Sequence, residues 1–168
     1  MFFLIDCSSG MEGAKTAAAE IMRELRHELE KMSWETDADV EVAVLKYSGE
    51  TDGAAGFGEV CMELSEKMSC AEFIKYGAYL PVVILLSGNA PPCGYEKGLE
   101  VLLQNARFKN STRLALPIGK DVNLDILAEF AGGKEAVLSP AVNTADIISI
   151  IRERFKEPVG YALLDGEE

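Results

Sequence analysis

Three polar residues near the start of the chain could do chemistry, because they follow directly on a short apolar run. Residues 2–5 are continuously apolar, and Asp6, Ser8 and Ser9 come just after them, before a helical pattern begins. A continuous apolar run is typical of a buried strand in a parallel sheet. Ligands of open α/β sheets bind beyond the carboxyl ends of such strands. The sequence therefore predicts a functional loop at Asp6, Ser8 and Ser9.

The residues of this loop leave four interpretations open. Lys15 and Thr16 resemble the end of a phosphate-binding P-loop, but Ser9 and Ala14 stand where that motif needs glycines. A flavin phosphate at the helix N-terminus is the second interpretation, although the carboxylate of Asp6 would repel it. A metal site built on the Asp-x-Ser motif is the third. The fourth is structural, with the loop's Asp and Ser side chains capping the following helix.

Length and charge restrict the class of protein. The chain has 168 residues, which is typical of one domain with a substantial core. Its 16 basic and 28 acidic residues give a net charge of −12, which disfavours nucleic acid and anionic membranes as partners. No apolar segment reaches the roughly 18 residues of a membrane span, and the first residues lack the features of a signal peptide.

The cysteines and the histidine offer little for catalysis. Four cysteines are scattered without C-x-x-C spacing, which indicates reduced thiols in the cytoplasm rather than a disulfide framework. They are Cys7, Cys61, Cys70 and Cys93. Cys7 is next to the predicted loop, and we expect it to pack beneath the loop. His27 is the only histidine, and its charged neighbours predict a solvated position. We therefore expect no enzymatic activity and no cofactor.

Strand and helix patterns alternate along the chain. Strands are predicted at residues 2–6, 40–47, 81–87, 112–118 and 135–138, with helical patterns between them. The patterns also predict a turn at residues 34–37, a short amphipathic segment at 71–76 and a helix over 95–106. Asn123 is expected to cap a further helix that Gly132 and Gly133 end. This alternation predicts an α/β fold with a doubly wound, mostly parallel central sheet and helices on both faces. The first and third of these strands are expected to be central. We predict a single domain over residues 1–157 and a C-terminal tail over residues 158–168.

The order of these motifs resembles the von Willebrand factor A (VWA) domain. A strand leads into Asp6-Cys7-Ser8, a Gly-rich loop spans residues 53–58, and a buried strand ends in Leu85-Leu86-Ser87-Gly88-Asn89-Ala90-Pro91. The resemblance covers roughly residues 2–155 and is to bacterial domains of the tellurium-resistance type. It implies a VWA-like, Rossmann-like three-layer sandwich. It also implies a non-catalytic protein-interaction module whose protein partner binds at the strand ends.

The metal-ion-dependent adhesion site (MIDAS) of that family is degenerate in this chain. The resemblance implies ligands from an Asp-x-Ser-x-Ser motif, from a Thr in the Gly-rich loop and from an Asp after the later strand. Asp6 and Ser8 match this pattern. The other positions lack a side-chain oxygen, and they are Gly10, Ala55 and Gly88. Because magnesium needs nearly octahedral oxygen ligands, one carboxylate and one hydroxyl predict that no divalent metal is bound.

The Gly-rich loop admits two alignments with the family. Aligned from the downstream helix, the loop has Ala55 at the Thr position, whereas alignment from the upstream strand would place Thr51 there. We prefer the first, because it also accounts for Gly58. The segment between Tyr47 and Gly53 is then shorter than is usual in the family. We therefore expect an edge strand to be absent beside the strand at residues 40–47.

The predicted binding rim surrounds the remnant of the metal site. It comprises Asp6, Ser8, Ser9, Gly10, Ala55, Ser87, Gly88 and Asn89. Exposed apolar residues beside polar loops mark partner sites, so apolar neighbours of the rim should be exposed. The residues expected to be exposed together are Ser9, Met11, Phe57, Asn89 and Pro91. A small enzyme, or a nucleotide- or flavin-binding protein that uses the same rim, is the alternative function.

The degenerate positions also suggest how a metal site could be rebuilt. Gly10→Ser, Ala55→Thr and Gly88→Asp together would supply the missing side-chain oxygens. We expect the triple variant to bind manganese, with Gly88→Asp contributing most because it adds a second negative charge.

Overall fold

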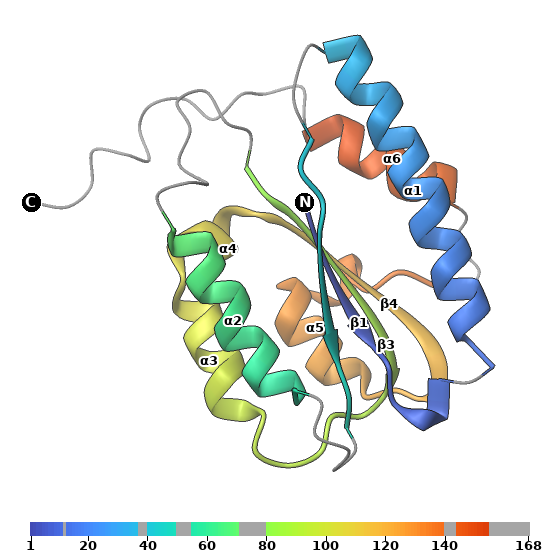
Figure 1. Cartoon of the computed structure of the whole chain (residues 1–168). Coiled ribbons are helices and arrows are strands. Elements are labelled where there is room, and N and C mark those ends of the chain that lie inside the picture. Colours follow the sequence, from blue (N-terminus) through green and yellow to red (C-terminus); the bar gives the residue numbers. More distant parts are fainter. Residues whose placement is uncertain (12, 37–39, 50–54, 71–79, 140–143, 155–168) are drawn as a thin grey trace, which may run out of the picture.

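A sheet of four parallel strands, in the spatial order β2–β1–β3–β4, forms the centre of the molecule (Figure 1). The strands are β1 (Phe2–Asp6), β2 (Ala43–Tyr47), β3 (Val82–Asn89) and β4 (Thr112–Asp121). The structure is a computed structural model that describes residues 1–11, 13–36, 40–49, 55–70, 80–139 and 144–154. The prediction of a mostly parallel sheet with the first and third strands central is confirmed.

Helices cover both faces of this sheet (Figure 1). On one face lie α1 (Lys15–Thr36) and α6 (Thr144–Arg154). On the other lie α2 (Phe57–Ser69), α3 (Glu96–Gln104), α4 (Ala106–Asn110) and α5 (Leu124–Ala131). Two short 3-10 helices complete the described elements, η1 (Ser9–Met11) and η3 (Lys134–Ala136). The three-layer α/β arrangement is the predicted one. None of the described helices is both long and apolar enough to cross a membrane.

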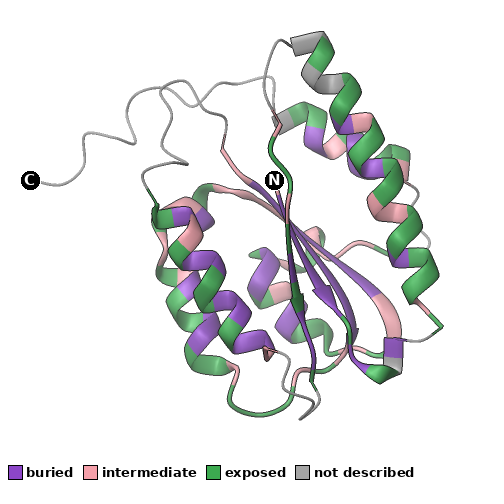
Figure 2. Ribbon diagram, in the orientation of Figure 1, coloured by how far each residue is buried: buried purple, intermediate pink, exposed green. Residues whose placement is uncertain are grey.

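Strand β1 divides the core into two layers. Phe2 and Leu4 pack in the α2–α5 layer, whereas Phe3 and Ile5 pack in the α1/α6 layer. All four side chains are buried, and the central strands are buried along most of their length (Figure 2). A strand that is covered on both faces must be apolar at successive positions, which explains the continuous apolar run in the sequence.

Two elements differ from the sequence-based prediction. Residues 134–136 form η3, and Val137 alone makes a parallel bridge to Ala115 of β4, where a fifth strand was predicted over 135–138. The 3-10 turn takes up half of that segment, which leaves too few residues for a ladder. Helix α1 continues to Thr36, into the segment where a turn was predicted at residues 34–37. It contains no Gly or Pro that would interrupt its hydrogen bonds, so Trp34 remains helical although it is 89% exposed.

The helix predicted over residues 95–106 is two helices, α3 and α4. The side-chain oxygen of Asn105 accepts hydrogen bonds from the backbone N–H groups of Arg107 and Phe108. A capping residue needs an extended backbone, so Asn105 ends α3 as it begins α4. The short amphipathic segment predicted at residues 71–76 and the predicted tail at 158–168 lie outside the described residues. The domain limits therefore stay a prediction.

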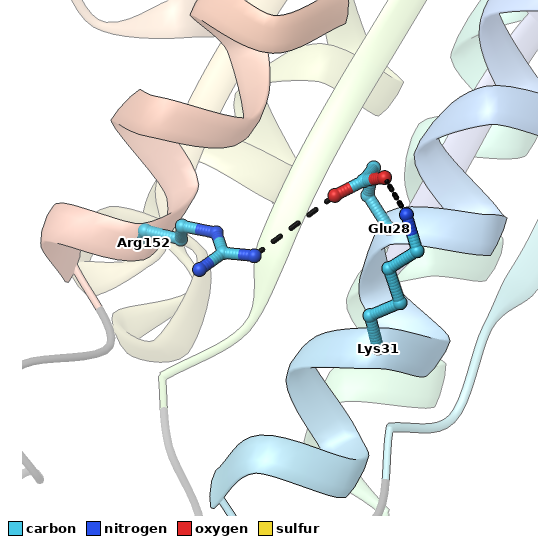
Figure 3. Close-up of polar contacts among 3 residues, drawn as sticks. All are labelled: Glu28, Lys31 and Arg152. Carbon is cyan, nitrogen blue, oxygen red and sulfur yellow. Dashed lines mark hydrogen bonds and ion pairs between the residues drawn. The ribbon is translucent and has the colours of Figure 1, made fainter.

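An exposed ion-pair cluster joins α1 and α6 (Figure 3). Nζ of Lys31 lies 2.6 Å from Oε1 of Glu28, whose Oε2 lies 3.9 Å from a guanidinium nitrogen of Arg152. The hydrogen bond from Lys31 is the main reason why the pKa of Glu28 is lowered. His27 is exposed nearby, as predicted, and lines a groove between the two helices. Exposed ion pairs contribute little to stability, so apolar packing holds this layer together.

Candidate functional site

Asp6 ends β1 and is held by the neighbouring strand β3. The two strands pair in register up to Ile5 and Leu86, and β3 then continues past the end of β1 to Asn89. The backbone N–H groups of Gly88 and Asn89 each donate to Oδ2 of Asp6 at 3.0 Å. The side chain of Asp6 is therefore only 2% exposed, although it was predicted to belong to a functional loop.

Ser8 occupies the other oxygen of the same carboxylate. Its backbone N–H donates to Oδ1 of Asp6 at 2.9 Å, and its hydroxyl donates to that oxygen as well. Nδ2 of Asn89 in turn donates to Oγ of Ser8 at 2.8 Å. We call Asp6, Ser8, Gly88 and Asn89 the strand-end network. A carboxylate has about four lone-pair sites, and here each oxygen accepts two hydrogen bonds.

The strand-end network links β1 to β3, which is not the helix cap that one interpretation of the sequence offered. Helix α1 begins only at Lys15, after η1. The bond from the N–H of Ser8 to Asp6 closes an Asx-turn, the local hydrogen bond by which Asp side chains start turns. The carbonyl of Ser8 then accepts from the N–H of Met11 at 3.0 Å, which forms η1 and includes Gly10.

Gly88 lies where there is no room for a side chain. A Cβ atom at this position would lie 1.9 Å from Sδ of Met11 and 3.5 Å from Oδ2 of Asp6. On its other side, a Cβ atom on Gly119 of β4 would lie 1.8 Å from the carbonyl oxygen of Gly88. The register of β3 and β4 shifts between Ser87 and Asn89, beside this close approach. Two glycines thus allow β3, β4 and η1 to meet around Asp6.

Met11 and Phe57 were expected to be exposed at the rim, and this expectation is wrong. Met11 is fully buried, because η1 turns it beneath the end of β3 against Gly88. Phe57 is 2% exposed, because the first turn of α2 faces the sheet and places its ring 5.1 Å from that of Tyr47. Ser9 is exposed as expected, whereas Asn89 and Pro91 are half-buried. Met11 and Phe57 therefore give no support to a binding rim.

Cys7 is exposed, although it was expected to pack beneath the loop. The alternation of β1 continues past its end, so Asp6 and Ser8 share the buried side and Cys7 between them points outward. Its backbone N–H donates to the carbonyl of Tyr47 at 2.7 Å, which extends the pairing of β1 with β2. All four cysteines are free thiols, and burial raises the pKa of Cys61 to about 12.

Tyr47 and Ser87 are buried residues with hydroxyl groups that adjoin the strand-end network. Tyr47 stands opposite Asp6 in the register of β1 and β2, and burial together with that carboxylate raises its pKa far above the ordinary value. The tyrosine is therefore protonated at neutral pH. The hydroxyl of Ser87 donates to the carbonyl of Asn89 at 3.1 Å. Ala55 is half-buried and its carbonyl accepts from the N–H of Ser48 at 2.9 Å, whereas Thr51 lies outside the described residues.

Leu124 is a large exposed apolar residue shortly after the end of β4, and sequence reasoning missed it. It is 57% exposed and begins α5, three residues after Asp121. Asp121 pairs with Asn89 at the end of β3, and its carbonyl accepts from the N–H of Ala90 at 2.8 Å. The capping residue Asn123 could have indicated this exposure from the sequence. Leu124 follows the cap as the first residue of the helix, so no preceding helical turn covers its side chain.

The strand-end network does not fit a divalent cation of the kind that a MIDAS motif holds. A cation needs lone pairs, and N–H and O–H donors occupy those of Asp6, while the amide of Asn89 donates to Ser8. Gly88 supplies no side chain, and Met11 fills the space beside it. In the part of the chain that the structure describes, no three His, Cys, Asp or Glu side chains gather closely enough to hold a metal.

Comparison with known proteins supports the fold. No family model and no curated protein sequence matches the chain. Two structures of proximal thread matrix protein 1 from the mussel byssus are similar, one of them with a zinc-occupied MIDAS motif. The zinc-occupied structure matches 91% of this chain at a TM-score of 0.62 and 14% identity. The second crystal form matches 94% of it at 0.53 and 13%. This chain spans 46% of the length of that protein. The fold is therefore VWA-like.

Proposed function

We propose that this chain is a non-catalytic protein-interaction module of VWA type that works without a bound metal ion. The observation that carries the proposal is the strand-end network. An amide N–H is an electropositive donor, and Asn89 directs one at Ser8, where a metal site would need a cation. Hydrogen bonds from β3 thus join the two loops that a shared ion would otherwise join.

We place the partner at the rim of loops beyond the strand ends. Of the predicted rim residues, the buried ones form the scaffold, and they are Asp6, Ser8, Ser87 and Gly88. Ser9, Ala55 and Asn89 reach the surface to differing extents. Leu124, three residues after the Asp121 that pairs with Asn89, adds an exposed apolar side chain of the kind that anchors a protein partner. Relationship to bacterial tellurium-resistance domains and a cytoplasmic location stay predictions from the sequence.

An enzyme at the same rim finds less support. Catalysis there would need an available base or an activated nucleophile. The carboxylate of Asp6 is saturated by donors, and burial raises the pKa values of Tyr47 and Cys61, which keeps both groups protonated.

Titration with manganese or magnesium tests the metal-independent part of the proposal. We expect no heat beyond dilution in buffer of about 150 mM salt, because the lone pairs of Asp6 are already used. Asp121→Asn is the control for weak binding to exposed carboxylates. Binding at millimolar or tighter affinity that Ser8→Ala abolishes in a folded protein, and that Asp121→Asn leaves unchanged, would contradict the proposal.

Leu124→Arg tests the rim as the partner surface. A protein captured from the source cell should bind this variant at least about 30-fold more weakly, because a central apolar anchor contributes 2 kcal/mol or more. Val101→Arg is the matched control, since Val101 is also exposed on a helix but lies on α3. Equal weakening by both variants, or by neither, would remove the rim as the binding surface.

A further inference from the structure

Strand β2 (teal in Figure 1) lies at one edge of the described sheet. In the described sheet β2 pairs with β1 alone. The N–H of Ala43 donates to the carbonyl of Met1, and the carbonyl of Tyr47 accepts from Cys7. Backbone groups alternate in direction along a parallel strand, so those of Val44 and Lys46 point away from β1.

The carboxyl end of this edge is closed, whereas the rest of it has no backbone partner among the residues that the structure describes. The N–H of Ser48, the next outward-pointing group, donates to the carbonyl of Ala55 at 2.9 Å. No described strand or loop pairs with Val44 or Lys46 on the same side. The absence of an edge strand that the short segment after Tyr47 led us to expect stays a prediction, because residues 50–54 lie outside the described residues.

One face of β2 is partly exposed as well. Leu45 and Tyr47 are buried under α2, in the same core layer as Leu64. Val42 and Val44 point to the opposite face and are 37% and 41% exposed, and the buried core on that side contains no residue of β2 (Figure 2). An added strand would therefore find both a hydrogen-bonding edge and an apolar surface.

We infer that this edge accepts an extended segment of another protein as an additional strand. The segment would carry β-branched residues beside Val42 and Val44, because such residues pack well across strands. It would carry an acidic residue beside Lys46, which is exposed and belongs to none of the ion pairs among the described residues. Edge addition of this kind draws affinity from main-chain hydrogen bonds and specificity from alternate side chains.

A second copy of the chain would pair with the edge of β2 less favourably than a segment of another protein. Antiparallel self-pairing centred on Val44 would place Lys46 opposite Val42 of the other copy, without an opposite charge. The net charge of −12 also repels one copy from another. A lysine on an edge strand opposes unselective pairing, while it attracts a strand that carries an acid. This surface is distinct from the rim at the strand ends and does not depend on the function proposed there.

An array of seven-residue peptides tests the inference on the full chain. The peptides alternate valine and threonine and carry one glutamate, which is moved along the series. We expect the best peptide to shift the NMR signals of the Val44 and Lys46 amides most and to leave those of Ser9 and Leu124 unchanged. Binding by none of the peptides, or shifts centred on Ser9 and Leu124, would overturn the inference.

Val44→Pro and Val44→Thr are a matched pair of variants that test the outward-pointing N–H group of residue 44. Proline removes the outward N–H and obstructs the edge without breaking the bonds to β1, and should weaken binding at least about tenfold. Threonine keeps the N–H and the shape, and should change binding less than about threefold. Unaltered binding to a folded Val44→Pro variant would overturn the inference.

Lys46→Glu provides a test that leaves the backbone intact. The variant should bind the glutamate peptide about fivefold more weakly and prefer a lysine at the same peptide position. The absence of this reversal would overturn the proposed contact with Lys46. Sedimentation of the unliganded protein distinguishes a second copy of the chain from a segment of another protein. A dimer that the Val44→Pro substitution dissociates would show that a second copy occupies the edge of β2, and this would overturn the proposal.

Discussion

Replacing Asp6 with alanine should destabilise the protein by about 3–5 kcal/mol, because it leaves several donors at a buried site without their acceptor. The change leaves the N–H groups of Ser8, Gly88 and Asn89 without their acceptor in a buried place. An unsatisfied buried donor costs about 1–3 kcal/mol. We expect the total loss to be less than the sum of the costs for the three N–H groups, because water can partly hydrate the site. Urea denaturation followed by circular dichroism measures the loss.

Two further variants show whether the loss comes from the network. Asp6→Asn keeps the shape of the side chain but directs its NH₂ group at two donors. Its stability should therefore lie between that of wild type and that of Asp6→Ala. Asp121→Ala removes an exposed carboxylate at the end of β4 and should stay within about 0.5 kcal/mol of wild type. If Asp6→Ala is as stable as Asp121→Ala, or if manganese stabilises wild type but not Asp6→Ala, the network does not hold the loops as described.

Gly88→Asp should destabilise the protein by about 3 kcal/mol, near the upper end of the cost of overpacking a core. The new Cβ would meet Sδ and Cγ of the buried Met11 at 1.9 and 2.5 Å. The added carboxylate would also lie near Asp6, where like charges repel. The sequence alone predicted that the triple variant with Gly10→Ser and Ala55→Thr would bind manganese, with Gly88→Asp contributing most, and the packing around Gly88 argues against that contribution. Thermal and urea denaturation with and without manganese separates the two outcomes.

Gly88→Ala and a double variant divide the cost of Gly88→Asp into its parts. Gly88→Ala adds the Cβ without the charge, so the difference between the two substitutions reports the repulsion from Asp6. Met11→Ala together with Gly88→Asp removes the obstructing side chain and should be more stable than Gly88→Asp alone. A Gly88→Asp protein with wild-type stability that binds manganese would show that Met11 does not close the site.

Local patterns in the sequence determined the order of the elements and the centre of the sheet. Residues 2–5 and the run that begins at Val82 are apolar at every position, and burial on both faces requires that pattern. Some helix ends followed from residue type as well. Asn123 caps α5, and Gly132 ends it with a φ of 88°, a conformation that glycine adopts without strain.

The tertiary structure alone decided what the Asp6 carboxylate does. Its partners at Gly88 and Asn89 are 82 and 83 residues away, and the extension of β3 past β1 brings them there. Nothing local distinguishes a carboxylate that awaits a cation from one that accepts backbone N–H groups. The burial of Met11 and Phe57 was likewise decided by where η1 and α2 meet the sheet. A short sequence pattern specifies which face of an element is apolar, but contacts between distant elements depend on how the whole chain packs.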